Sequence, residues 1–228
     1  MRILYVIPAR AGSKGLPEKN IKILGKKPLI EYSIDFALAN MLDNDELCIS
    51  TNDSKVIEIV KAKGISVPFI RPDSLASDDS STQDVLIHAL NYYESIDKKF
   101  DVILLLQPTS PFRNQEDFTR LLSEFSSEID MVVSVKIAKE NPYFSLFEEK
   151  SGGYLKKSKK GVFTRRQDCP LVYAFNGSMY LINIEALRNN KIGDFKKIKK
   201  IVMPEERSID IDTFADWVLA EYYLKKII

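Results

Sequence analysis

The sequence of 228 residues predicts an α/β fold with a doubly wound, mostly parallel sheet that carries helices on both faces. Short apolar, β-branched runs alternate along the chain with segments of helical periodicity, which is the pattern of strand–helix–strand units. The run from Val102 to Leu106 is apolar at every position, as expected of a central parallel strand that is buried on both faces. In a sheet of this kind, ligands bind beyond the carboxyl ends of the strands.

The first half of the chain alternates strand and helix signals. Pro28 suits the first position of a helix that runs to about residue 39. Asn52 or Asp53 suits the cap of a second helix, which ends at Gly64. Apolar runs predict strands over residues 3–7, 47–50, 65–70 and 102–106.

The second half follows the same alternation. Ser80 or Ser81 begins a helix with one apolar face, and Asn114 caps the next helix. Thr213 and Asp216 have the spacing of a capping box at the start of the last helix. Apolar runs predict strands over residues 131–137, 178–183 and 200–203.

Residues 139–170 interrupt this alternation. With Gly152-Gly153 as a turn, they predict an inserted ribbon within a single domain that spans residues 1–228. The lysine cluster beside the turn lacks interleaved aromatic residues and a larger basic field. A solvated hairpin face is therefore a better interpretation of this cluster than a nucleic-acid site. Its members are Lys156, Lys157, Lys159 and Lys160.

The composition limits the possible partners. Lysine and arginine number 33 against 32 aspartates and glutamates, so the net charge of +1 favours neither nucleic acid nor an acidic membrane as a partner. Cys48 and Cys169 lie far apart without metal-binding spacing, and no stretch has the length and apolarity of a membrane span. Residues 1–20 lack a signal-peptide pattern, so we expect a cytoplasmic protein. The single histidine, His88, has no partner placed by spacing and is interpreted as helix packing or surface.

The loop after the first strand, residues 8–20, carries Arg10, Lys14 and Lys19 together with glycines. Its spacing matches neither the dinucleotide fingerprint nor the P-loop. Glycines allow a close approach of the backbone, and three cations can bind several phosphate oxygens. The loop therefore predicts a polyphosphate site, with an ordinary basic surface turn as the alternative.

Asp210 and Asp212 lie two residues apart just before the last helix. In an extended segment both carboxylates point the same way, which is easiest to explain if a divalent cation lies between them. Mg²⁺ accepts one or two carboxylates and completes its octahedron with water and substrate phosphates. The alternative is a solvated strand edge followed by the helix cap. A phosphate cradle that faces two carboxylates is what nucleotidyl transfer needs, although kinases need the same groups.

Taken together, the polar motifs resemble the acylneuraminate cytidylyltransferases, also called CMP-sialic acid synthetases, a family that includes relatives activating legionaminic and pseudaminic acids. The resemblance covers nearly the whole chain, and its motifs are specific as a set. They are residues 7–10 with 13–17 and 19–20, residues 71–72 with 75–78, residues 105–111, Arg166-Gln167, Asn176-Gly177 with Tyr180, and residues 208–213.

The resemblance implies a Rossmann-like nucleotidyltransferase fold, CTP as the nucleotide and Mg²⁺ as the cofactor. Asp210 and Asp212 would bind the metal, with Arg10, Lys19 and Asp212 as the catalytic residues. It also implies that residues 139–170 cross to a neighbouring subunit, which makes a homodimer. The nucleotide would be bound by Ala9, Arg10, Lys14, Lys19, Asn20, Arg71, Ser80 and Thr82, and the nine-carbon sugar acid by Gln107, Arg166, Asn176 and Tyr180.

Two departures from the family pattern concern the sugar acid. Tyr173-Ala174-Phe175 stands where many sialic acid enzymes have an arginine shortly before Asn-Gly, and Asn141-Pro142 stands where many have His-Pro. A legionaminic or pseudaminic type of acid is therefore as plausible as N-acetylneuraminic acid.

Three alternatives to this function stay open. They are a synthetase for CMP-Kdo, a metal-dependent glycosyltransferase suggested by the Asp-x-Asp spacing, and a nucleotide-binding regulator without turnover. Either metal coordination or Asp212 as a base could activate the attacking hydroxyl, and we favour the metal, since an unperturbed carboxylate is a weak base at neutral pH.

Overall fold

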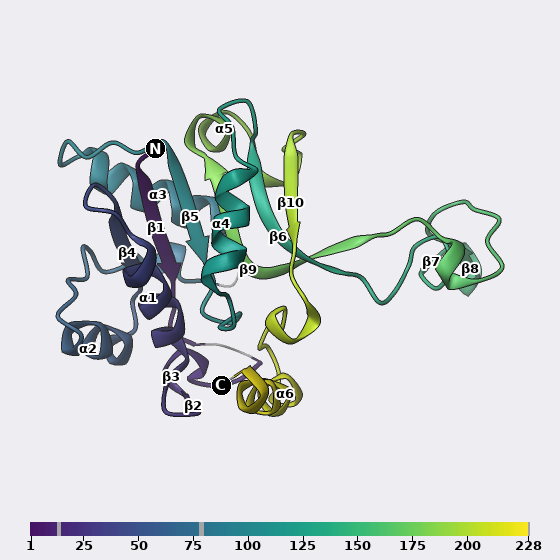
Figure 1. Ribbon diagram of the computed structural model, residues 1–228, viewed down its shortest axis with the longest axis horizontal. Coiled ribbons are helices and arrows are strands. Elements are labelled where there is room, and N and C mark those ends of the chain that lie inside the picture. Colours follow the sequence, from purple (N-terminus) through teal and green to yellow (C-terminus); the bar gives the residue numbers. More distant parts are fainter. Residues whose placement is uncertain (13–14, 78–79, 228) are drawn as a thin grey trace.

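The fold is built on a six-stranded sheet, seen in a computed structural model that describes residues 1–12, 15–77 and 80–227 (Figure 1). The strand order is β10-β6-β9-β5-β1-β4. Every pairing is parallel except those of β9, which runs antiparallel to both β5 and β6. The predicted mostly parallel sheet is confirmed. Its strands are β1 (Ile3–Pro8), β4 (Glu46–Ser50), β5 (Val102–Leu106), β6 (Met131–Ile137), β9 (Tyr173–Asn183) and β10 (Ile198–Val202).

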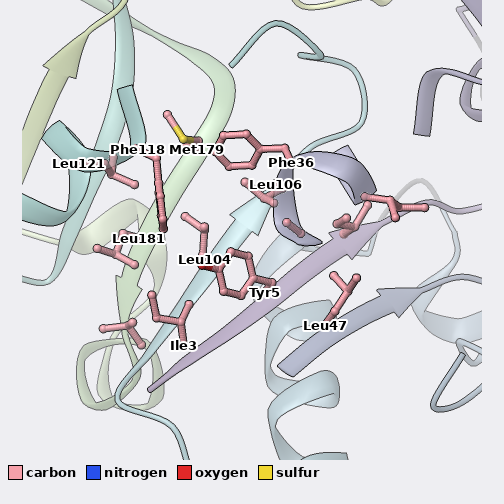
Figure 2. Packing of buried hydrophobic residues seen from close by; sticks show 14 of the residues in the cluster. Ile3, Tyr5, Phe36, Leu47, Leu104, Leu106, Phe118, Leu121, Met179 and Leu181 are labelled. Carbon is pink, nitrogen blue, oxygen red and sulfur yellow. The ribbon is translucent and has the colours of Figure 1, made fainter. Parts of the chain in front are cut away.

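Helices cover both faces of the sheet, as predicted (Figure 1). One face carries α1 (Leu29–Asn40), α2 (Ser54–Ala62) and α4 (Gln115–Ser123), and the other carries α3 (Thr82–Glu94) and α5 (Ile184–Asn189). Successive strand residues point to opposite faces, so each strand contributes to two apolar layers. Figure 2 shows one layer, in which Tyr5 and Leu104 lie below Phe118. Of these helices, α5 was not predicted.

The predicted helix caps are confirmed. Asp53 accepts a hydrogen bond from the Lys55 amide at the start of α2, and Ser81 and Asn114 cap α3 and α4 in the same way. Thr213 and Asp216 form the predicted capping box, in which the Thr213 amide donates to Asp216 Oδ2 at 2.8 Å, before α6 (Phe214–Ile227). Pro28 is the residue just before α1 rather than its first. Within the described ranges, no helix has the length and apolarity to cross a membrane.

Two strand predictions need correction. Residues 65–70 form no strand beyond a single bridge between Ile70 and Thr51, because Pro68 has no amide to donate to a ladder. The strand predicted over 178–183 begins earlier, at Tyr173, and contains a bulge. Val133 pairs with Tyr180, whereas Val135 pairs with Phe175, so β9 carries extra residues opposite Ser134.

A long segment projects from the end of the sheet between β6 and β9 (Figure 1). It corresponds to the predicted ribbon at residues 139–170 and carries the antiparallel pair β7 (Phe147–Glu149) and β8 (Leu155–Lys157). A second small pair, β2 (Ile23–Leu24) and β3 (Lys27–Pro28), lies beyond the carboxyl end of β1. Short 3-10 turns occur at Lys19–Ile21, Asp73–Leu75, Ser151–Gly153, Arg166–Asp168, Ile192–Asp194 and Glu205–Arg207.

Candidate active site

A cleft of about 320 Å³ lies beyond the carboxyl ends of the parallel strands. Three segments that are distant in sequence form it: the loop after β1, the loop after β5, and the segment that leads into α6. This is where a doubly wound sheet places its ligands. The cleft brings six predicted site residues together, namely Arg10, Lys19, Asn20, Gln107, Asp210 and Asp212.

The loop after β1 is held against the end of β4. The Ala9 amide donates to the Ser50 carbonyl at 2.9 Å, and the Ala11 amide donates to Asn52 Oδ1 at 3.0 Å. Ala9 is itself buried. These bonds fix the backbone on both sides of Arg10, whose guanidinium donates to the Ala76 carbonyl at 3.3 Å. Lys14, predicted to bind phosphate, lies outside the described residues.

The same loop contacts the carboxylate segment directly. Lys19 is 8% exposed, and its Nζ lies 2.8 Å from Asp212 Oδ1. A Cβ at Gly15 would lie 2.3 Å from the Asp212 carbonyl oxygen, a separation that no side chain tolerates. Glycine is therefore required at this position, because it allows the loop to touch the segment that carries both carboxylates.

The two carboxylates have different surroundings. Asp212 is exposed and pairs with Lys19, whereas Asp210 is largely buried. Burial raises the pKa of Asp210, the neighbouring Asp212 raises it further, and a hydrogen bond from Thr109 with the charge of Lys19 opposes them. The Ile211 amide, between the two, donates to the Thr109 carbonyl at 2.9 Å. This bond fixes the segment at the mouth of the β5 loop.

This pair of carboxylates fits a magnesium ion. Asp210 Oδ1 is buried and has no hydrogen-bond donor within the part of the chain that the structure describes. A buried carboxylate oxygen without a donor is costly, and a cation would compensate it. In the described ranges no three His, Cys, Asp or Glu side chains cluster as a metal site, so the protein would supply two carboxylates. Mg²⁺ is commonly bound by one or two carboxylates together with substrate phosphates.

A smaller hollow of about 190 Å³ adjoins the cleft and shares Pro8 and Arg10 with it. It is lined by Arg71, Ser80 and Thr82, all predicted to bind the nucleotide. Arg71 is 4% exposed, its Nε donates to Ser50 Oγ at 3.1 Å and its Nη2 donates to the Ser50 carbonyl. Burial, together with the charge of Arg10, lowers the pKa of Arg71 to about 10. The guanidinium is thus fixed at the wall of the hollow.

A larger hollow of about 600 Å³ shares Gln107 with the cleft and Thr82 with the small hollow. We call it the large hollow. Tyr180 lines it, and burial and the charge of Asp210 raise the pKa of its hydroxyl. Gly177 adopts φ +73° in the β9 bulge, and a Cβ there would lie 2.8 Å from Gln107 Oε1 and 3.2 Å from Asp210 Oδ2. The bulge therefore brings the backbone of β9 against both side chains.

The other two predicted sugar-binding residues lie elsewhere. Asn176 is 1% exposed, and its amide is used inside the protein: Nδ2 donates to Ser208 Oγ at 3.0 Å, and Oδ1 accepts from Ser134 Oγ at 2.7 Å. These bonds join β9 and β6 to the segment before Asp210. Arg166 is exposed in the projecting segment and lines neither the cleft nor the two hollows.

The sequence interpretation missed Arg113, which organises the β5 loop. Arg113 is 7% exposed, and none of the carboxylates in the described structure pairs with it. It donates to the carbonyls of Gln107 at 2.7 Å and Ser110 at 2.6 Å, and to the hydroxyls of Ser33 and Ser178. Burial lowers its pKa to about 9. Sequence patterns predict that an arginine in a polar loop is exposed, and nothing in the local sequence indicates that Arg113 is buried.

A second missed feature anchors the carboxylate segment from the other side. Asp117 in α4 is completely buried and accepts two hydrogen bonds of 3.0 Å from Arg207. Arg207 lies just before Ser208, so this bidentate pair fixes the chain shortly before Asp210. The signal in the sequence is a lone acidic residue on the inner face of α4, which no spacing rule connects to residue 207.

Several known proteins are similar to this chain over nearly its whole length. CMP-N,N'-diacetyllegionaminic acid synthase of Legionella pneumophila is 36% identical over 97% of this chain and 95% of that protein, and pseudaminic acid cytidylyltransferase of Campylobacter jejuni is 31% identical over 99% and 97%. A solved CMP:2-keto-3-deoxy-manno-octonic acid synthetase complexed with CTP superposes with a TM-score of 0.71 over both full chains, although only 18% of its residues are identical. The family model described as Cytidylyltransferase matches residues 4–225. The chain belongs to the cytidylyltransferase family.

Proposed function

We propose that this protein transfers a cytidylyl group from CTP to a nonulosonic acid, a sialic-type sugar acid, and releases pyrophosphate. The observation that supports this most is that three spaces adjoin one another. A small hollow with a fixed arginine, a cleft with cations and two carboxylates, and a large hollow share lining residues pairwise. A base, its phosphates and a sugar acid that attacks beside them would need three adjoining spaces of this kind.

The nucleotide would occupy the small hollow and the cleft. Arg71, Ser80 and Thr82 line the space for cytosine, next to the first turn of α3. Arg10 and Lys19 would bind the phosphates with Lys14, and Asn20, whose amide donates to the Arg10 carbonyl at 3.4 Å, would hold Arg10 in place. The charge that develops on the leaving pyrophosphate would then be met by groups that are already in position.

The sugar acid would occupy the large hollow, with Gln107 and Tyr180 as polar contacts. Its anomeric hydroxyl would give up its proton to water, and the oxygen would form a bond to the α-phosphorus. The bond from that phosphorus to the bridging oxygen would break, and pyrophosphate would leave with the bonding electrons. Asp210 and Asp212 would hold Mg²⁺, which when bound offsets negative charge on the phosphates and lowers the pKa of a coordinated hydroxyl. Lys19, paired with Asp212, would keep the exposed carboxylate aimed into the cleft.

We also propose that the protein acts as a homodimer in the cytoplasm. Several apolar side chains of the projecting segment are exposed in a single chain, among them Phe147, Leu155 and Val162. An apolar surface of this kind is typical of an interface. Arg166 lies on the same segment, so a partner could bring it to the sugar acid. Both cysteines are free, which suits a reducing compartment.

The test is pyrophosphate release from CTP and Mg²⁺ with N-acetylneuraminic, legionaminic, pseudaminic and Kdo acids offered separately. We expect release with at least one of the first three acids. Release with Kdo alone would replace the nonulosonic acid by the eight-carbon acid. No release with any acid, while CTP still binds, would contradict the proposed reaction.

Replacing Arg71 by Ala is expected to raise the KM for CTP by about tenfold, the equivalent of ~1.4 kcal/mol, because a fixed donor at the base is lost. The preference for CTP over UTP should fall with it. Steady-state kinetics with both nucleotides measures this. Loss of folded protein would lower the rates with CTP and with UTP equally, so it would not change the ratio of their kcat/KM values. If the protein stays folded and this ratio is unchanged, another group recognises the base.

A further inference from the structure

The chain that carries Asp210 leaves β10 through a helical turn, Glu205–Arg207, before it reaches α6 (Figure 1). Arg207, the last residue of this turn, is bound to α4. Its Nε and Nη2 donate to the two carboxylate oxygens of Asp117, each at 3.0 Å. Asp117 lies in the first turn of α4 and is completely buried. Two parallel hydrogen bonds fix a direction as well as a distance, so the pair fixes the end of the turn against α4.

Asp210 follows shortly after this turn, and its backbone is held through its neighbours. The Ser208 hydroxyl accepts from Asn176 at 3.0 Å, and the Ile211 amide donates to the β5 loop at 2.9 Å. Among the described residues, neither Ile209 nor Asp210 has a backbone hydrogen bond. The side chains of Ile209 and Ile211 are buried, but apolar packing is not directional. The place of the Asp210 carboxylate therefore depends on directed bonds made on either side of it.

The proposed metal site needs this carboxylate to be placed accurately. Asp210 Oδ1 is buried without a donor in the described ranges, and Lys19 binds the other carboxylate, Asp212. Mg²⁺ demands near-ideal octahedral geometry with short bonds to its oxygen ligands. A small displacement of Asp210 relative to Asp212 would therefore weaken the binding of the cation more than it would weaken the fold.

Stability alone does not account for the buried pair. Replacement of a buried ion pair by apolar side chains of similar volume is often neutral or stabilising, because the attraction between the charges roughly offsets the loss of their hydration. Apolar side chains cannot supply a direction. The bidentate pair of Arg207 and Asp117 supplies one at the residue from which the chain runs to Asp210.

We propose that Arg207, fixed by Asp117, is a positioning residue for Asp210, and that this pair sets the affinity of the site for its divalent cation. Arg207 does not line the cleft. It acts through residues 208–210, the short chain whose end carries the buried oxygen. The inference rests on the proposed function, which assigns the two carboxylates to a metal.

The main variant replaces both members of the pair, Asp117→Val together with Arg207→Met, so that no buried charge is left unpaired. Mn²⁺, which suits the same oxygen ligands as Mg²⁺, is titrated into the protein with CTP but without sugar acid, and water-proton relaxation measures its Kd. We expect this Kd to rise by at least about tenfold, as for other residues that orient metal ligands, with the melting temperature Tm near that of the wild type. Turnover lost at low Mg²⁺ should return when the Mg²⁺ concentration is raised.

Lys63→Met is the matched control. Lys63 joins α2 to α1 through two carboxylates, those of Glu31 at 2.9 Å and Asp35 at 2.8 Å. Its side chain is 26% exposed, close to the 21% of Arg207, and it does not line the cleft. We expect this variant to lower Tm without a change in the Kd for Mn²⁺. A substitution that only loosens the fold would behave like this control, so the two variants separate positioning from stability.

Arg207→Lys keeps the charge but not the two parallel donors, and we expect its Kd for Mn²⁺ to lie between those of the wild type and the double variant. A Kd within about twofold of the wild type in the double variant, or in Arg207→Lys if the double variant does not fold, would overturn the inference. A wild-type protein that binds no Mn²⁺ would overturn it as well. Failure of the proposed function would differ, because the wild type would bind Mn²⁺ and the double variant would bind it more weakly, yet no acid would give pyrophosphate.

Discussion

Replacing Asp210 by Asn is expected to lower turnover by at least about a hundredfold, roughly 2.7 kcal/mol, and at the same time to raise Tm at neutral pH. The first effect follows if Asp210 holds the metal. The second follows from its surroundings, because the carboxylate is largely buried and Oδ1 has no donor within the described residues. An amide would keep the bond from Thr109 without a buried charge. Relief of one such group gives about 1 kcal/mol, or roughly 2–4 °C in Tm.

The pH dependence of stability is an independent test of whether Asp210→Asn raises Tm. Burial, with Asp212, raises the pKa of Asp210 above its ordinary value of 3.8, so the folded state binds the proton more tightly than the unfolded chain. The stability that Asp210 contributes to the wild type is fully present below the pKa of this carboxyl in the unfolded chain. It is lost as the pH rises through the pKa of Asp210 in the folded protein. The Tm advantage of Asp210→Asn should therefore shrink as the pH falls toward 3.8. Thermal unfolding of both proteins across this range measures it.

Asp212→Ala is the matched comparison. We expect a similar loss of turnover, at least about a hundredfold, but no gain in Tm, because Asp212 is exposed and pairs with Lys19. If Asp210→Asn lost activity without a gain in Tm, the buried carboxylate of Asp210 would not destabilise the folded protein as proposed. Near-normal turnover in either variant would contradict the assignment of the two carboxylates to a metal.

Local sequence signals predicted most of the fold, and the failures have identifiable causes. The strands over 102–106 and 131–137 were predicted to the residue. The first is apolar at every position, as a strand buried on both faces is, and the second is mostly apolar and β-branched. The strand over 65–70 failed at Pro68. Asn176-Gly177 has the chemistry of a turn, and in the structure the same positive φ serves a bulge inside β9. Local composition shows that a left-handed residue is present, but not whether the chain turns back.

The site divides in a similar way. Charged residues in loops at strand ends were found from sequence, since polar groups at those positions face the ligand side of the sheet. Arg113 and Asp117 were missed, because their roles depend on partners far away in the chain, such as Ser178 for Arg113 and Arg207 for Asp117. A buried arginine and an exposed one have the same local sequence. What separates them is tertiary contact, which one sequence does not contain.

Arg113→Met should be among the most destabilising single substitutions in this protein. Methionine fills much of the same volume, but it donates no hydrogen bonds. The carbonyl of Ser110 and the hydroxyls of Ser33 and Ser178 would lose a donor in a buried region. The carbonyl of Gln107 would keep only the longer bonds from the Ser110 amide at 3.3 Å and the Ser33 hydroxyl at 3.5 Å. Each unsatisfied buried group costs about 1–3 kcal/mol, while removal of a buried charge without a carboxylate partner returns part of that cost. We expect a net loss of about 2–4 kcal/mol, or roughly 4–16 °C in Tm.

The functional consequence should follow the loop that Arg113 holds. Gln107 would lose the shortest bond at its carbonyl, so the KM for the sugar acid should rise more than the KM for CTP, whose proposed contacts lie on the β1 loop and in the small hollow. Arg188→Met is the control, because Arg188 is exposed and pairs with Glu94, and such a surface pair contributes about 0–1 kcal/mol. If Arg113→Met melted within a degree or two of Arg188→Met, the buried acceptors would have to find other donors. The β5 loop would then be held by Asn176 and Ile211 rather than by the arginine.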